Sequence, residues 1–232
     1  MIELELNSIY PREIIACDEV GRGPLGGPVV AGALKVHVES KRDLKALLTK
    51  LDSLGINDSK KLSEKNRLKI LTDLGLHETE LRQTCILKIG KSEVKLLTWD
   101  LDHEVIDKEN ILAASLRAMK EAAVELSEVK ETKSLVLIDG NKSFPWAQVS
   151  PFEEVSIVQG DSKSKLIGLA SILAKHVRDE YMKKMHLLYP EYGFDKHAGY
   201  PTEIHRKALE TYGPSPIHRK TFKGVKEFIR NS

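Results

Sequence analysis

The sequence predicts an α/β protein, in which a mixed sheet of five strands is flanked by helices and followed by a helical C-terminal extension. Five short apolar runs have the composition of strands, and helical patterns lie between the later ones. The early strands follow one another closely, whereas the later strands are separated by helices. This arrangement is typical of a mixed sheet with helices against it rather than of an all-β barrel.

Each element has its own signal in the sequence. Ser63 can cap the first helix and Gly75 can end it, and the break Gly213-Pro214-Ser215-Pro216 separates the last two helices. The strands are expected at residues 13–17, 28–36, 84–89, 134–138 and 155–159. The helices are expected at residues 63–75, 111–126, 164–188, 202–211 and 221–229.

The composition excludes several classes of protein. A chain of 232 residues with 41% hydrophobic and 30% charged residues has the profile of a soluble globular domain. No apolar run approaches the about 20 residues that span a bilayer, and the N-terminal MIELELNSIY lacks the features of a signal peptide. We therefore expect a cytoplasmic protein without a membrane partner. Cys17 and Cys85 lie in apolar runs, so free thiols are expected rather than a disulfide or a thiolate metal site.

The charge is unevenly distributed along the chain. Residues 1–159 carry a net charge of −4, whereas residues 160–232 carry 14 Lys and Arg against 8 Asp and Glu, a net charge of +6. A basic end of this kind indicates a polyanionic partner such as nucleic acid. An ordinary solvated surface would have the same composition, so charge alone leaves both interpretations open.

A glycine-rich segment follows the first strand. Residues 21–26 (GRGPLG) match the dinucleotide-binding pattern G-x-G-x-x-G. That pattern binds a pyrophosphate only when its glycines open a helix, whereas residues 28–34 (PVVAGAL) have the composition of a strand. The segment therefore does not indicate an oxidoreductase, and the two acids before it need another explanation.

Three of the expected strands end at acids. Residues 14–17 lead into Asp18 and Glu19, residues 135–138 into Asp139, and residues 156–160 into Asp161. Acids at strand ends can meet at one edge of a sheet, where two anions need cations between them. A single Asp at such a position is more often a turn or a helix cap, which is the alternative for each of them.

The type of ligand indicates the type of metal. Carboxylate oxygens without nearby thiols favour Mg²⁺ or Mn²⁺, and His197, His205 and His218 lack the spacing of a zinc site. Acids that hold two such ions can activate a water molecule and stabilise the leaving oxygen of a phosphodiester. Together with the basic C-terminal end, they predict a metal-dependent nuclease.

A series of motifs resembles the ribonuclease HII family, the type 2 ribonucleases H. The resemblance extends from Ile15 to about Phe222 and keeps the family's order of motifs. The motifs are residues 18–24 (DEVGRGP), 57–62 (NDSKKL), 137–141 (LIDGN), 160–162 (GDS), 170–175 (ASILAK), 192–202 (YGFDKHAGYPT) and 218–222 (HRKTF).

The resemblance implies a ribonuclease H-like fold, with a catalytic domain at residues 1–200 and a helical extension at residues 201–232 packed on it. It implies an endonuclease that hydrolyses the RNA strand of RNA–DNA hybrids. It also implies cleavage on the 5′ side of single ribonucleotides embedded in duplex DNA, which leaves a 3′-hydroxyl and a 5′-phosphate. The expected cofactor is Mg²⁺ or Mn²⁺, two ions with substrate bound, and the expected state is a monomer.

The site residues are carried over motif by motif. The metal-binding catalytic acids would be Asp18, Glu19, Asp139 and Asp161, with Asp18 as the bridging ligand. The substrate-binding residues would be Gly21, Arg22, Gly23, Lys60 and Tyr200, with Ser171 and Lys175 as further phosphate contacts. The glycine-rich main chain would contact the ribose 2′-hydroxyl, because no Cβ stands between a glycine backbone and the sugar. The alternatives are a core or turn position for Tyr200 and solubilising roles for the lysines.

Two alternative functions compete with this interpretation. A type 3 ribonuclease H would carry an extra N-terminal domain, and this chain has only seventeen residues before Asp18. A non-catalytic nucleic-acid-binding module would retain the basic end without needing acids at three strand ends. A metal-dependent cleavage assay separates the enzyme from the binding module.

Overall fold

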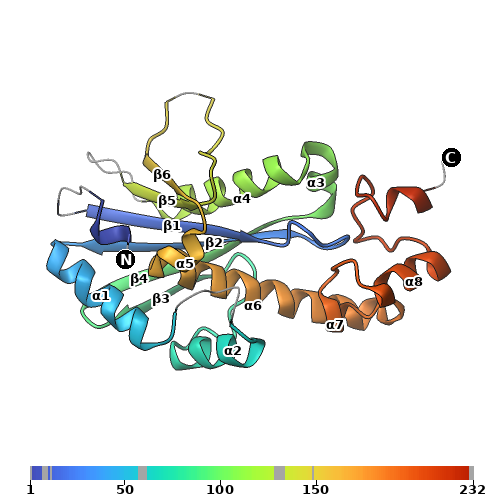
Figure 1. Cartoon of the computed structure of the whole chain (residues 1–232), viewed down its shortest axis with the longest axis horizontal. Helices are drawn as coiled ribbons and strands as arrows, with labels where there is room; N and C mark the ends of the chain where they lie inside the picture. Colours follow the sequence, from blue (N-terminus) through green and yellow to red (C-terminus); the bar gives the residue numbers. More distant parts are fainter. Residues whose placement is uncertain are drawn as a thin grey trace.

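The computed structural model describes residues 2–6, 10, 12–56, 62–127, 134–147 and 149–229, and its centre is a mixed sheet (Figure 1). The strands are β1 (Arg12–Val20), β2 (Val29–Val38), β3 (Thr84–Ile89), β4 (Ser92–Leu101), β5 (Leu135–Asp139) and β6 (Glu153–Ile157). Their order across the sheet is β3-β4-β2-β1-β5-β6. β1 runs antiparallel to β2 and parallel to β5, which in turn is parallel to β6. The predicted α/β class is confirmed.

The sheet has six strands where five were expected, because β4 was missed. A tight turn at Gly90 and Lys91 joins β4 to β3, and β4 pairs with β2 on its other side. Its sequence SEVKLLTWDL places charged residues among the apolar ones. It therefore lacks the continuous apolar run by which the other strands were recognised.

Capping residues fix the starts of the main helices. Ser63, Ser164 and Thr202 each accept a hydrogen bond from a backbone N–H in the first turn that follows. The α-helices are α1 (Lys41–Ser53), α2 (Glu64–Asp73), α3 (His103–Glu109), α4 (Ile111–Leu126), α5 (Gly160–Lys163), α6 (Lys165–Leu188), α7 (Phe194–His197) and α8 (Glu203–Tyr212). The 3₁₀ helices are η1 (Ile2–Leu4), η3 (Pro190–Tyr192) and η4 (Lys226–Phe228). The expected helices at α2, α4, α6 and α8 are confirmed, whereas α1 and α3 were not expected.

The helix expected at residues 221–229 is wrong. Turns occupy most of this segment, and only the short η4 is helical. Gly224 has φ +94°, which interrupts a right-handed helix in the middle of the segment. Phe222 and Val225 of this segment nevertheless pack into an apolar cluster.

The sheet separates two apolar cores, because successive side chains of a strand point to opposite faces. Ile14 and Ala16 of β1 belong to one core with residues of α1, α2 and α6. Ile15 and Cys17 belong to the other core with residues of α3 and α4. Figure 1 shows these two groups of helices on opposite sides of the sheet. β1 is thus covered on both faces until it leaves the core at its C-terminal end.

Gly32 in β2 allows α6 to cross the sheet closely. A Cβ at this position would lie 2.2 Å from the backbone oxygen of Ala170. We expect Gly32→Ala to lower the free energy of unfolding by about 2 kcal/mol, because strand and helix must separate to admit a methyl group. Urea denaturation measures this loss, and an unchanged unfolding midpoint would contradict the close approach.

The C-terminal segment packs at one end of the sheet, beside the turn between β1 and β2 (Figure 1). A third apolar cluster joins Leu25 of that turn to Met182 of α6, Phe194 of α7 and Leu209 of α8. The backbone N–H of Gly27 donates to the carbonyl of Ile217 at 2.9 Å. The segment therefore supports the turn directly, while the division of the chain at residue 200 stays a prediction.

Candidate active site

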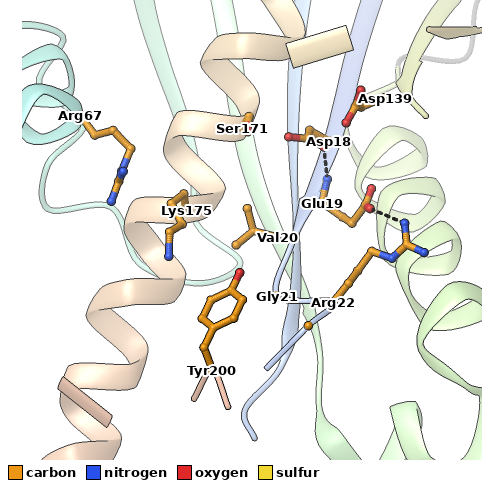
Figure 2. Close-up of a pocket in the computed structure, with 11 residues that line it drawn as sticks. Asp18, Glu19, Val20, Gly21, Arg22, Arg67, Asp139, Ser171, Lys175 and Tyr200 are labelled. Atoms are coloured by element: carbon orange, nitrogen blue, oxygen red, sulfur yellow. Dashed lines mark hydrogen bonds and ion pairs between the residues drawn. The ribbon is translucent and has the colours of Figure 1, made fainter. Parts of the chain in front are cut away.

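Two parallel strands bring two acids together. β1 and β5 pair with Cys17 opposite Ile138, so the next residues along the two strands are Asp18 and Asp139. Parallel strands end at the same edge of a sheet, where both carboxylates leave the core. Asp18 and Asp139 line one pocket of about 570 Å³ (Figure 2). The convergence expected from the strand ends is present.

Asp18 lies where negative charge accumulates. Only 2% of its surface is exposed. Burial raises the pKa of Asp18 well above its usual value, and the charges of Asp139 and Glu19 raise it further, whereas a hydrogen bond with Ser171 acts in the opposite direction. Its Oδ1 accepts a hydrogen bond from the backbone N–H of Glu19 at 2.8 Å. An ionised Asp18 is therefore unfavourable here unless a cation enters the pocket.

Glu19 faces away from Asp18 and toward the glycine-rich turn. Its Oε1 lies 3.2 Å from Nη1 of Arg22, and Figure 2 shows this contact on the opposite side of β1 from Ser171. The Glu19 side chain is 11% exposed and that of Arg22 is 51% exposed. Because the Arg22 side of this pair is exposed, the pair contributes little, and another cation can replace Arg22 at small cost.

Asp161 is buried, like Asp18. It lies in the first turn of α5, next to Gly160, whose backbone N–H donates to Oδ1 of Asp139 at 2.5 Å. Asp161 does not line the pocket that Asp18, Glu19 and Asp139 share. The structure thus brings three of the four predicted acids into one pocket and places the fourth beside it.

The donor set suits a hard divalent cation. Carboxylate groups of Asp18, Glu19 and Asp139 line one pocket, and oxygen ligands of this kind are the ones that Mg²⁺ and Mn²⁺ prefer. Within the described ranges, however, no three His, Cys, Asp or Glu side chains stand ready to hold one ion. The turn of Glu19 toward Arg22 accounts for part of this difference.

The glycine-rich turn and Tyr200 form one wall of the pocket. Gly21, Arg22 and Gly23 line it, and Gly21 has φ +97°, which favours glycine. A Cβ on Gly23 would lie 3.4 Å from the ring of Tyr200, so the turn and the ring are in close contact. Tyr200 is 39% exposed, and its ring faces the pocket rather than the core.

Basic residues of two helices form the opposite wall. Lys175 of α6 and Arg67 of α2 both line the pocket, and both bind the carboxylate of Asp179, at 2.5 Å and 3.2 Å. The ammonium of Lys175 lies 5.8 Å from the centre of the Tyr200 ring. Ser171, one turn before Lys175, also lines the pocket. Cations thus stand across the pocket from the acids (Figure 2).

For two residues, Arg67 and Lys60, the prediction from the sequence and the structure do not coincide. Sequence analysis did not find Arg67, because nothing in its amphipathic helix marks one arginine as facing a distant strand. Lys60, the predicted phosphate contact, lies outside the described residues. Its role stays a prediction.

Three histidines from residues 197–218 meet beside Tyr200. The rings of His197 and His205 stack with their centres 4.6 Å apart, and Nε2 of His205 lies 2.9 Å from Nε2 of His218. The backbone N–H of Ser215 donates to Nδ1 of His218, so the proton of neutral His218 is on Nε2. His205 then accepts at Nε2 and donates from Nδ1 to the carbonyl of Tyr200 at 2.9 Å.

This chain of hydrogen bonds requires neutral rings. We therefore expect the free energy of unfolding to depend on pH. Burial lowers the pKa of His205 to about 4 and that of His218 to about 3, from a usual value of 6.5. The unfolded chain binds protons on these rings near pH 6.5, whereas the folded protein binds them only near the lower values. Their stabilisation is therefore complete above pH 6.5 and is lost as the pH falls toward 4 and then 3. Urea denaturation at several pH values measures it.

Two variants distinguish the protonation of the buried histidines from other effects of low pH on stability. His205→Asn is expected to be less stable at pH 7 and to lose less stability on acidification. His37→Asn is the control, because His37 is 44% exposed and its Nε2 lies 3.3 Å from Glu39 at the surface. If the free energy of unfolding changes with pH equally in the wild type and in His205→Asn, a buried neutral ring at His205 is contradicted.

Comparisons with known proteins identify first the class and then the family. The chain resembles the crystal structure of Bst-RNase HIII in complex with Mn²⁺ with a TM-score of 0.61 at 16% identity, covering 94% of this chain and 69% of that one. It therefore has the ribonuclease H-like fold. A family model for ribonuclease HII matches residues 15–225.

Relatives in sequence agree with the family model. Ribonuclease HII of Desulfotalea psychrophila is 37% identical over 98% of this chain and 88% of its own, and that of Chlamydia muridarum is 43% identical over 95% and 86%. The chain belongs to the ribonuclease HII family. It is a ribonuclease H, a divalent-metal-dependent endonuclease that degrades the RNA of RNA–DNA hybrids.

Family membership decides between the alternative functions that the sequence left open. The resemblance to ribonuclease HII is confirmed, and the dinucleotide-binding and purely binding interpretations are excluded. No helix among the described residues is long and apolar enough to cross a membrane. The cytoplasmic location stays a prediction.

Proposed function

We propose that this protein cuts duplex DNA on the 5′ side of a single embedded ribonucleotide, leaving a 3′-hydroxyl and a 5′-phosphate. One observation carries the proposal: the acids Asp18 and Asp139 and the turn Gly21–Gly23 line the same pocket. A backbone that can contact one ribose thus lies beside the groups that would direct its cleavage. A hybrid-specific enzyme would not need this proximity at a single nucleotide.

The four acids would hold two Mg²⁺ or Mn²⁺ ions with substrate bound. Such ions supply an activated water and stabilise the leaving oxygen of the phosphodiester. Asp18 is the candidate bridging ligand, because the charges of Asp139 and Glu19 both act on it. The Mn²⁺ complex of Bst-RNase HIII supports this class of ion. Asp161, buried beside Asp139, would complete the set after a small adjustment.

The other walls of the pocket would hold the nucleic acid. The main chain of Gly21–Gly23 would contact the 2′-hydroxyl, and the half-exposed ring of Tyr200 would pack on the following sugar. Arg67 and Lys175 would attract phosphates, because their charges face the pocket across from the acids. Lys60 is a further candidate for a phosphate contact.

A single chain supplies every wall of this pocket, so we propose that the protein acts as a monomer. We also propose that residues 1–200 form the catalytic domain and residues 201–232 an extension that supports the glycine-rich turn. The backbone hydrogen bonds from Gly27 to Ile217 and from Arg219 to Leu25 support this arrangement.

Three duplexes of one sequence test the proposed function: all DNA, DNA with one ribonucleotide, and an RNA–DNA hybrid. Each is incubated with Mg²⁺, with Mn²⁺ or with a chelator. We expect one cut on the 5′ side of the ribonucleotide, dependent on the metal, with a 3′ end that a polymerase extends. Cleavage of the hybrid alone would overturn the proposal and leave the family activity intact.

Arg22→Ala tests recognition separately from cleavage. We expect the preference for the ribonucleotide duplex over the all-DNA duplex to fall by about threefold to tenfold, because one hydrogen bond contributes about 1 kcal/mol. The ratio of the two dissociation constants measures it. Arg42→Ala, an exposed arginine of α1, is the control. An unchanged ratio in Arg22→Ala would count against a sensing role for its side chain.

A further inference from the structure

Arg219 is a fully buried arginine whose side chain binds one turn only. Its exposed surface is 0%. A guanidinium has five N–H donors, and each finds a backbone carbonyl here. Nε donates to Gly27 at 3.0 Å, Nη1 to Arg22 at 3.1 Å and Pro24 at 2.8 Å, and Nη2 to Gly21 at 2.6 Å and Pro28 at 3.2 Å. All five acceptors belong to residues 21–28, at the other end of the sequence.

The charge of Arg219 is not neutralised by an ion pair within the part of the chain that the structure describes. Burial, and the nearby charge of Arg178, lower the pKa of Arg219 to about 9, so it remains charged at neutral pH. An unpaired buried cation is costly unless its hydrogen bonds are complete. The five carbonyls supply that completion, and the arginine fixes their directions in return.

The direction of these carbonyls determines the direction of two N–H groups. In a trans peptide the C=O and the following N–H lie in the peptide plane and point in opposite directions. Because Arg219 holds the carbonyls of Gly21 and Arg22, the N–H groups of Arg22 and Gly23 point away from it. Among the described residues, these two N–H groups have no backbone acceptor, whereas those of Leu25 and Gly27 do. Successive N–H groups of this kind form a concave site for an electronegative atom.

We propose that Arg219 is a positioning residue for ribose recognition, which holds the N–H groups of Arg22 and Gly23 toward the 2′-hydroxyl oxygen of the substrate. The inference rests on the proposed function and deepens it. Arg219 touches no substrate and acts only through the turn. Its residue type matters because a lysine keeps the charge but lacks the planar fork that reaches several carbonyls at once.

Arg219→Lys is tested against Arg178→Lys, a matched control. Arg178 is equally buried, but its donors go to the carbonyls of Pro28, Gly26 and Ala198 and not to those of Gly21 or Arg22. We expect both variants to lose stability. Only Arg219→Lys should lower the ratio of dissociation constants for the all-DNA and ribonucleotide duplexes, by about tenfold, as for lost hydrogen bonds. Equal ratios in the two variants would overturn the inference.

Nuclear magnetic resonance of the wild-type protein gives a second readout that needs neither cleavage nor the folding of a variant. Adding the uncut ribonucleotide duplex with a chelator should shift the amide resonances of Arg22 and Gly23 more than the all-DNA duplex does. An equal response to both duplexes would overturn the inference. If the wild type cleaves selectively but the ratio of dissociation constants is unchanged in Arg219→Lys, only the role of Arg219 is rejected. If the wild type does not cleave selectively, the proposed function is rejected.

Discussion

Asp18→Asn is expected to lower the rate of cleavage by about a thousandfold or more, because charge stabilisation by bound metal contributes several kcal/mol to the transition state. The variant should also be more stable than the wild type when a chelator is present. Asp18 is buried beside Asp139 and Glu19, which raises its pKa, so its ionised form destabilises the metal-free fold at neutral pH. A neutral amide removes this repulsion and can still accept the hydrogen bond from the Glu19 N–H.

Thermal unfolding and cleavage of the ribonucleotide duplex measure the two effects. Mg²⁺ should raise the unfolding temperature of the wild type more than that of Asp18→Asn, because a ligand stabilises the state that binds it. Asp73→Asn, an exposed position at the end of α2, is the control for both assays. A variant at Asp18 that cleaves at the wild-type rate would remove Asp18 from the site.

Gly21→Ala is expected to lower the free energy of unfolding by about 3 kcal/mol or more, from two separate causes. The φ of +97° is unfavourable for alanine. A Cβ would also lie 2.3 Å from Nε of Arg178 and 2.8 Å from the carbonyl oxygen of Pro28. Relief of this clash must move the turn or the buried arginine, so we also expect cleavage to fall at least about tenfold, as for one displaced transition-state contact.

A second glycine, Gly75, measures the effect of the backbone conformation without the steric clash. Gly75 has φ +70°, and a Cβ there would meet nothing within 4 Å. Gly75→Ala should therefore lose only about 1 kcal/mol, the contribution of the backbone conformation. Urea denaturation of the two variants gives the contribution of the clash as their difference. Equal losses would mean that the contact with Arg178 adds nothing.

The acids at the strand ends were predictable because the signal is local. A short continuous apolar run followed by an acid indicates both the strand and the position where the chain leaves the core. The parallel neighbours β1 and β5 then place Asp18 beside Asp139. The sequence did not indicate that Glu19 turns toward Arg22, because a side-chain rotamer depends on neighbours that only the folded structure defines.

The basic C-terminal end shows where such reasoning fails. Its net charge of +6 was interpreted as a surface for polyanions. Arg178 and Arg219 contribute to that count, yet both are fully buried and bind backbone carbonyls. No local pattern distinguishes a buried arginine from an exposed one, because the partners of Arg219 lie almost two hundred residues earlier. The meeting of His205 and His218 was not predicted either, because these residues appeared in the sequence only as a spacing unsuitable for zinc.

The pairing of Arg219 with the turn after β1 also sets an order of events during synthesis. Translation delivers Asp18, Glu19 and the glycines early, and domains generally fold from the N-terminal side during synthesis. The amides that we propose to contact the ribose would acquire their direction only when the ribosome has released the segment around Arg219. A nascent or prematurely terminated polypeptide would thus carry the carboxylates without an ordered turn for binding the ribose. Selectivity for the ribonucleotide would therefore arise late in synthesis.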